Sequence, residues 1–208
     1  MIEQIANVLR SHPEYGQRVL KVVDIGGGRG LLSNFLAETF GDSAIDVKVI
    51  DISKSATNNG QMRARRQGIT NIKFEARDAT TLPFDDVDVV VALHACGVLS
   101  DVALGHATCQ GAGFVICPCC FKSNPHLRVS IPAEESGGVT KLVTAEEFLG
   151  VDPSEYVHLK HLAELQGDIN IASKAMHTIC GLRALAVSRR SAANLDVSKY
   201  GSVVSYVK

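Results

Sequence analysis

The stretch Val22-Val23-Asp24-Ile25-Gly26-Gly27-Gly28-Arg29-Gly30 decides the fold of this chain. It joins a short apolar run, residues 20–25, to a segment with helical apolar spacing, residues 31–40. Glycines at such a junction allow a sharp turn, positive φ and close approach of the backbone to a ligand. Four glycines in five positions are more than a turn alone needs, so the stretch predicts a ligand-binding loop.

The spacing of the glycines narrows the choice of ligand. A dinucleotide fingerprint starting at Gly26 or Gly28 would require glycine where Leu31 or Ser33 stands, which disfavours a nicotinamide oxidoreductase. A P-loop would require Gly-Lys-Ser/Thr, which is not found there. The spacing acid-x-Gly-x-Gly-x-Gly fits instead and resembles motif I of class I S-adenosylmethionine (SAM) dependent methyltransferases. Its members are Asp24, Gly26, Gly28 and Gly30.

Strand-like and helix-like segments alternate through the first half of the chain. Continuous Val/Ile runs indicate strands that are buried on both faces. The pattern predicts an α/β fold, a Rossmann-like, doubly wound and mostly parallel sheet, in one domain over residues 1–208. Further strands are expected at residues 47–52, 72–76, 87–93 and 113–117, and helices at residues 2–10, 53–67 and 98–109.

The second half has a weaker pattern. Residues 121–140 contain prolines and glycines and are predicted to form a loop. Residues 169–189 have the apolar spacing of a long helix, although residues 182–188 are also compatible with a strand. Class I methyltransferases usually end in an antiparallel strand pair. Short helices are expected at residues 145–149 and 154–165, and a terminal strand at residues 203–207.

Two acids lie at the ends of the next predicted strands, Asp51 within the end of one and Asp78 just after the other. Asp51 lies about 20 residues past the glycine loop, where doubly wound folds place an acid that accepts from ribose hydroxyls. The resemblance implies that Asp78 accepts from the adenine amino group. A helix cap for Asp51 and a solvated loop acid for Asp78 are the alternatives. The predicted SAM-binding residues are Asp24, Gly26, Gly27, Gly28, Gly30, Asp51, Ile52, Asp78, Ala79, Leu93 and His94.

Two further motifs end the fourth and fifth strands, Leu93-His94-Ala95-Cys96-Gly97 and Pro118-Cys119-Cys120. Together with Asp101 they resemble the methyltransferase domain of glutathione S-transferase C-terminal-domain-containing proteins. They are more distantly similar to the tRNA 2′-O-methyltransferases that act on the acceptor stem. The resemblance covers residues 20–125 well and the remainder loosely.

The same motifs supply the candidate catalytic residues: His94, Cys96, Cys119 and Cys120. A histidine can remove the acceptor proton because its ordinary pKa is near neutral. It could equally orient the strand-end loop, and the cysteines could be small buried hydrophobes. Zinc is disfavoured because Cys-x-Cys-Cys lacks the usual spaced ligand pairs and adjacent strand residues point to opposite faces. No metal is therefore predicted.

The composition indicates a soluble globular protein. The chain has 208 residues, 46% hydrophobic and 21% charged, with a net charge of −1. Six cysteines without a disulfide-like spacing, and no export signal, favour a reducing compartment, the cytoplasm or the nucleus. No membrane span is expected, and a monomer is the default. Two small basic groups could contact nucleic acid: Arg63, Arg65 and Arg66, and Lys122, His126 and Arg128.

These observations predict a SAM-dependent methyltransferase of unknown acceptor, with RNA implied by the resemblance. The absence of an Asn/Asp-Pro-Pro-Tyr motif after the fourth strand argues against methylation of a base amino group. The alternative is a SAM-binding or degenerate domain that serves as a scaffold or interaction module without turnover.

Overall fold

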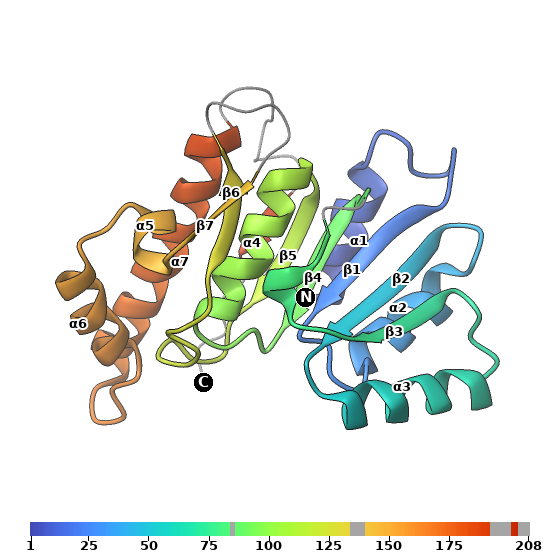
Figure 1. Cartoon of the computed structure of the whole chain (residues 1–208), viewed down its shortest axis with the longest axis horizontal. Helices are drawn as coiled ribbons and strands as arrows, with labels where there is room; N and C mark the ends of the chain where they lie inside the picture. The colour runs from blue at the N-terminus through green and yellow to red at the C-terminus, as the bar shows by residue number, and fades with distance from the viewer. Residues whose placement is uncertain (84–85, 134–139, 192–200, 204–208) are drawn as a thin grey trace.

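A six-stranded parallel sheet forms the centre of the computed structural model, which describes all residues except 84–85, 134–139, 192–200 and 204–208 (Figure 1). Its strand order is β3-β2-β1-β4-β5-β8. The chain therefore adds strands on one side of β1 up to β3 and on the other side from β4 onward, while all strands stay parallel. This arrangement confirms the predicted doubly wound α/β fold. The strands are β1 (Leu20–Ile25), β2 (Ile45–Asp51), β3 (Ile72–Ala76), β4 (Val89–Leu93), β5 (Gly113–Cys117) and β8 (Gly201–Val203).

Helices cover the sheet on two sides (Figure 1). Side chains alternate along β1, so that Val22 joins one apolar cluster with Leu9 and Leu36, while Val23 joins the other with Leu104. The first cluster lies under α1 (Ile2–Ser11), α2 (Leu31–Phe40) and α3 (Lys54–Arg66). The second lies under α4 (Val98–Gln110) and the long helix α7 (Ile169–Ser191).

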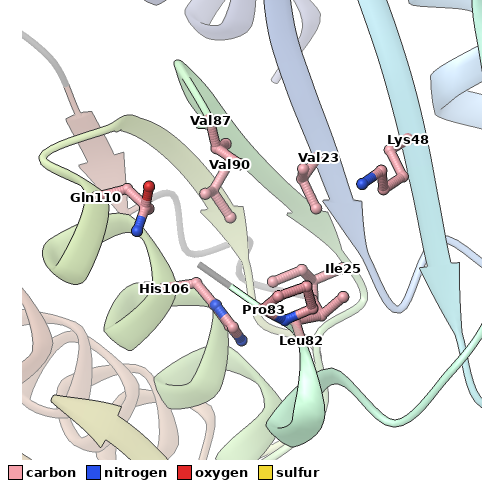
Figure 2. A pocket seen from close by; sticks show the side chains of 9 residues that line it. All are labelled: Val23, Ile25, Lys48, Leu82, Pro83, Val87, Val90, His106 and Gln110. Carbon is pink, nitrogen blue, oxygen red and sulfur yellow. The ribbon is translucent and has the colours of Figure 1, made fainter. Parts of the chain in front are cut away.

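The connection from β3 to β4 is short. Among its described residues it forms a single turn of 3₁₀ helix, η1 (Ala79–Thr81), where a doubly wound sheet commonly has a full helix. A cavity of about 30 Å³ lies beside it, between Leu82 and His106 on one side and Val23 and Val90 on the other (Figure 2). The Nε2 atom of His106 lies 2.7 Å from the carbonyl oxygen of Ala79 and joins α4 to this turn.

The short connection leaves one face of β2 and β3 polar. Lys73 pairs with Asp46 across the two strands at 3.2 Å, and both side chains are exposed. Glu75 pairs with Arg77 at 2.6 Å. Burial on both faces, which continuous Val/Ile runs indicate, therefore does not extend to β2 and β3, since no described helix covers their outer face.

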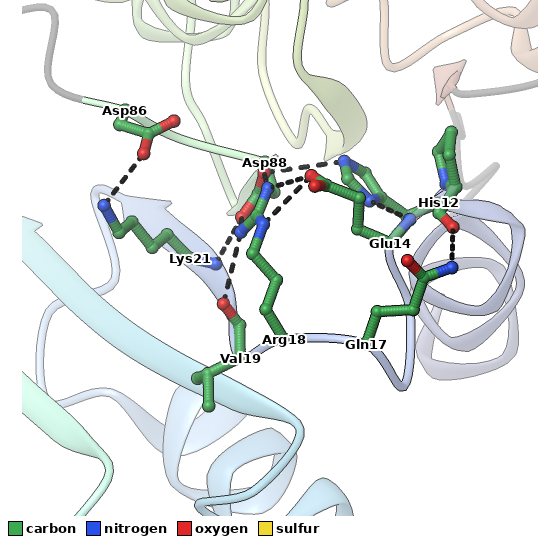
Figure 3. Close-up of polar contacts among 9 residues, drawn as sticks. His12, Glu14, Gln17, Arg18, Val19, Lys21, Asp86 and Asp88 are labelled. Atoms are coloured by element: carbon green, nitrogen blue, oxygen red, sulfur yellow. Dashed lines mark hydrogen bonds and ion pairs between the residues drawn. The ribbon is translucent and has the colours of Figure 1, made fainter.

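A network of charged groups fixes the starts of β1 and β4 (Figure 3). Both carboxylate oxygens of Asp88 accept from the guanidinium of Arg18, at 2.6 and 2.7 Å. Asp88 also accepts from the backbone N–H of Lys21 at 2.7 Å. β4 starts at Val89, two residues later than predicted.

A two-stranded antiparallel sheet begins inside the predicted loop of residues 121–140, which contains its first strand and the start of its second. Its strands are β6 (Val129–Pro132) and β7 (Thr140–Val143). The prediction of a loop was wrong for β6 because this strand depends on a long-range contact with Gly105 of α4. A Cβ atom on Gly105 would lie 2.5 Å from the carbonyl oxygen of Ser130, so the absence of a side chain lets the strand pack against the helix. The buried side chain of Val129 completes this contact.

The helices of the second half follow the prediction closely. They are α5 (Ala145–Leu149), α6 (Pro153–Ala163) and α7, which includes residues 182–188 and so excludes a strand there. The final strand β8 pairs parallel with β5, unlike the antiparallel pair typical of class I methyltransferases. It starts two residues earlier than predicted, and residues 204–207 of that prediction lie outside the described part of the chain. No helix within the described ranges has the length and hydrophobicity to cross a membrane.

A buried ion pair joins α7 to α4. The guanidinium of Arg183 donates to both carboxylate oxygens of Asp101, at 2.8 and 3.1 Å, and neither side chain is exposed. Arg183 also donates to the carbonyl oxygen of Gly97 at 3.1 Å. A planar guanidinium suits such bidentate binding, so this pair fixes α7 against the loop that follows β4.

We expect Arg183→Ala to lower the free energy of unfolding by about 3–5 kcal/mol, because it leaves the carboxylate of Asp101 buried without a countercharge. Urea denaturation followed by circular dichroism measures this change. The double variant Arg183→Met/Asp101→Leu removes both charges and should recover much of the loss. The exposed Lys73→Ala is the control and should change stability little. A loss in Arg183→Ala no larger than that of the control would contradict the role of the pair.

Candidate active site

The glycine loop adopts the conformation that its composition predicts. Gly26, Gly28 and Gly30 all have positive φ, at +72°, +55° and +62°. The backbone N–H of Gly28 donates to Oδ2 of Asp51 at 2.9 Å, which fixes the loop at the end of β2. Arg63 of α3 donates to the carbonyl oxygen of Arg29 at 2.8 Å. Arg63 therefore helps to hold the glycine loop in place through its hydrogen bond to the backbone.

Asp24 lies beneath the loop and is almost fully buried. Its Oδ2 atom accepts a hydrogen bond of 2.5 Å from the hydroxyl of Ser33, and its Oδ1 atom has no partner among the described residues. Burial, chiefly, raises the pKa of Asp24 to about 6, with a smaller contribution from the charge of Asp51, while the Ser33 hydrogen bond opposes the rise. Asp24 thus differs from the other predicted cofactor residues in supporting the loop from below.

A cavity of about 170 Å³ opens at the ends of β2 and β3. Oδ1 of Asp51 accepts from the N–H of Ser53, and Oδ1 of Asp78 accepts from the N–H of Thr80. Both acids therefore hold their own turns while facing the cavity, so cap and ligand roles are compatible. The structure brings together here the predicted residues Gly26, Asp51, Ile52, Asp78 and Ala79.

A second cavity of about 430 Å³ lies at the ends of β4 and β5. His94 lines it with an exposed side chain and a φ of +59°, a conformation that L-residues other than glycine rarely adopt. Because β1 lies between β2 and β4 in the sheet, the glycine loop separates the two cavities. The second cavity is lined by Met1, Ile2, Leu32, Leu93, His94, Cys117, Pro118 and Cys119.

Three of the predicted catalytic residues converge on one point. The sulfur atoms of Cys96, Cys119 and Cys120 all lie within 4.8 Å of one another, and those of Cys96 and Cys119 are 2.8 Å apart. The argument that adjacent cysteines point to opposite faces is wrong for Cys119 and Cys120, because β5 ends at Cys117 and both residues belong to the loop that follows.

The loops after β4 and β5 are bound to each other. The N–H of Gly97 donates to the carbonyl oxygen of Cys120 at 2.9 Å, and Nδ2 of Asn124 donates to that of Cys96 at 3.1 Å. Gly97 has a φ of +55°, and a Cβ there would overlap the carbonyl group of Ser123. Only a glycine at this position lets the two loops approach in this way.

The loop that follows β5 also reaches the cavity of about 170 Å³, which the sequence did not predict. This loop contributes Asn124, His126 and Leu127, and the other residues that line the cavity beyond those predicted are Ile50, Arg77 and Leu99. His126, which was predicted with Lys122 and Arg128 as a possible nucleic-acid contact, lines this cavity together with Asp51 and Asp78. The only local signal was the Asn124-Pro125 pair, which is typical of a turn.

The strand order, the glycine loop and the acids after β2 and β3 together define a class I methyltransferase. A family model described as "Methyltransferase domain" matches residues 1–124, and the chain belongs to this family.

Similar curated proteins agree with the predicted resemblance. The chain is 26% identical over 188 residues to a glutathione S-transferase C-terminal domain-containing protein homolog of Drosophila melanogaster, covering 89% of this chain and 29% of that protein. It is 31% identical over 102 residues to the Homo sapiens protein of that name, covering 49% of this chain and 16% of that protein. The chain thus spans less than a third of the length of these relatives.

Two solved structures are also similar in part. A SAM-dependent methyltransferase from Aquifex aeolicus is 16% identical, with a TM-score of 0.39, covering 65% of this chain and 67% of that one. The YcgJ protein from Bacillus subtilis is 19% identical, with a TM-score of 0.43, covering 78% of this chain and 59% of that one.

The raised pKa of Asp24 predicts a pH-dependent contribution to stability. The folded state holds the Asp24 proton more tightly than the unfolded chain, whose ordinary pKa is 3.8. The free energy of unfolding therefore falls by about 3 kcal/mol on account of this group as the pH rises from about 4 to above about 6. Asp24→Asn stays neutral throughout, so its stability relative to the unaltered protein should increase over this range in urea denaturation.

Ser33→Ala provides a second test of the same group. It removes the hydrogen bond that favours the charged carboxylate, so the transition attributed to Asp24 should move to higher pH. A stability difference between Asp24→Asn and the unaltered protein that is constant from pH 4 to 8 would show that Asp24 is ionised normally.

Proposed function

We propose that this methyltransferase uses SAM as its methyl donor and holds it across the glycine loop, between the two cavities. The observation that carries the proposal is the position of the loop. It stands between a smaller cavity lined by Asp51 and Asp78 and a larger one lined by Leu93 and His94. A donor with a nucleoside at one end and a reactive centre at the other fits this arrangement.

The residues present are suited to the chemical groups of SAM. Oδ1 of Asp24 is a buried carboxylate oxygen without a described partner, and the sulfonium and ammonium groups of SAM are cations that a carboxylate attracts. A Cβ built on Gly28 meets nothing nearer than Oδ2 of Asp51 at 3.8 Å, so the loop has open space in front of it. Asp51 would accept from the ribose hydroxyls and Asp78 from the adenine amino group.

His94 is the residue that we assign to the acceptor proton. SAM, when bound, supplies a methyl group that its sulfonium activates, so the protein contributes chiefly positioning and proton removal. The exposed imidazole of His94 faces the larger cavity from a backbone held at positive φ, and strained conformations of this kind cluster at functional sites. His94 would accept the proton that the acceptor group releases.

We propose RNA as the acceptor class. Lys122 and Arg128 are exposed on the loop after β5, which contributes to both cavities, and cations in this position would neutralise phosphates near the acceptor group. Incubation of the chain with labelled SAM and total RNA tests this proposal. Label in RNA supports it, and label recovered in protein or small molecules alone contradicts it.

Gly28→Ala tests the place of the donor. The side chain would enter the space in front of the loop, so affinity for S-adenosylhomocysteine should fall at least tenfold in isothermal calorimetry. Gly68→Ala is the matched control, since Gly68 has a similar positive φ of +70° but lies in open space away from the loop. It should share the backbone strain and keep the affinity.

Two results would change the proposal. Unchanged affinity in a folded Gly28→Ala variant would show that the donor lies elsewhere. No binding of S-adenosylhomocysteine by the unaltered chain would favour a scaffold without turnover, and tight binding of NADH instead would indicate an oxidoreductase.

His94→Asn tests proton removal. Asparagine tolerates positive φ and keeps a polar side chain, but it cannot serve as a base. Methyl transfer to the acceptor should fall by about 10²–10⁴-fold, while affinity for S-adenosylhomocysteine stays within a factor of a few. Unaltered turnover in this variant would exclude His94 as the base.

A further inference from the structure

The cluster of Cys96, Cys119 and Cys120 has a use that methyl transfer does not require. We propose that these three cysteines bind one Zn²⁺ ion as thiolates. Their sulfur atoms meet within 4.8 Å although Cys96 is separated from the other two by a helix and a strand. Thiolates are ligands that zinc prefers, and three of them converge on one point here.

The observed spacing is close to that of a zinc site. Zinc–sulfur bonds of about 2.3 Å in tetrahedral geometry place two ligand sulfurs about 3.8 Å apart. The 2.8 Å between the sulfurs of Cys96 and Cys119 must therefore open by about 1 Å, which a small side-chain rotation provides. The free thiols of Cys96 and Cys119 are also farther apart than the roughly 2.05 Å of a disulfide bond, and such a bond would leave Cys120 without a partner, whereas one ion binds all three sulfurs.

The backbone around the cluster is already ordered for binding. Gly97 donates to the carbonyl oxygen of Cys120, and Asn124 donates to that of Cys96, so both loops are fixed relative to each other. The hydroxyl of Ser123 lies 3.2 Å from the sulfur of Cys120 and can donate to it. Hydrogen bonds of this kind orient metal ligands and tune their basicity.

The electrostatics of the cluster also call for a cation. Three thiolates at these distances would repel one another strongly, and a divalent cation between them removes that repulsion. All three residues are only partly buried, so an ion can reach them from solvent.

Three protein ligands leave the fourth zinc position to water or to a group from the larger cavity, which Cys119 lines. Zinc sites with three protein ligands and an open position are typical of reactive rather than purely structural zinc. The other group of metal-ligating side chains, His12, Glu14 and Asp88, is different because Arg18 already neutralises both of its acids.

The test measures metal content directly and does not depend on SAM binding or turnover. The full chain is purified without a histidine tag in a phosphine reductant, and zinc is determined by mass spectrometry and by titration against a chromophoric chelator. We expect about one zinc ion per chain, and a cobalt-substituted protein with the strong ultraviolet absorption of thiolate-to-metal charge transfer.

Variants show whether these cysteines are the ligands. Cys119→Ser and Cys120→Ser should lower zinc affinity at least a hundredfold and abolish the thiolate absorption of the cobalt protein. Cys109→Ser is the matched control, because Cys109 is a partly buried thiol outside the cluster, and it should retain full zinc content. Circular dichroism verifies that each variant folds.

Two results would overturn the proposal: no zinc at micromolar free metal, or full zinc content in a folded Cys119→Ser variant. Each result leaves the affinity for S-adenosylhomocysteine as a separate measurement, so failure of the zinc site and failure of the methyltransferase proposal are distinguishable.

Discussion

The close approach of the glycine loop to β2, β3 and α3 is the constraint on which the rest of the structure depends. A Cβ on Gly30 would lie 2.6 Å from the ring of Phe74, and one on Gly60 of α3 would lie 2.8 Å from the carbonyl oxygen of Arg29. Because both positions lack side chains, the loop can settle onto the sheet. Asp51 then reaches the N–H of Gly28, and the carboxyl ends of β1, β2 and β3 come together at one edge.

Local patterns were sufficient for much of the fold. The bounds of β1, α2, β3 and β5 follow directly from short apolar runs and from helical spacing between glycines. The bounds failed where a distant partner decides the conformation. Gly105 of α4 creates the surface on which β6 forms. This contact has no periodicity that sequence can reveal.

The residues of the candidate site also fall into those that local sequence patterns predicted and those that depend on distant contacts. Residues at or just after the end of a strand, such as Asp51, Asp78 and His94, were found because parallel strands bring their carboxyl ends to one edge. Asn124 and Leu127 were missed because their loop folds back across the start of α4 to reach the smaller cavity. The meeting of the three cysteine sulfurs was missed for the same reason, since it depends on the path of two loops held together through Gly97.

The buried pair of Arg183 and Asp101 shows that the part of the chain matched by the family model is not a separate structural unit. The family match ends at residue 124, and all of the proposed donor contacts lie before that point. Yet the countercharge of Asp101 comes from α7, and Glu164 accepts from the backbone N–H of Phe121 at 2.6 Å, beside the cysteine cluster. The stretch that the family model matches is therefore smaller than the stretch that these contacts hold together. A shorter protein that stopped at residue 124 would leave Asp101 without its guanidinium and the backbone N–H of Phe121 without its acceptor, so the C-terminal portion belongs to the same structural unit.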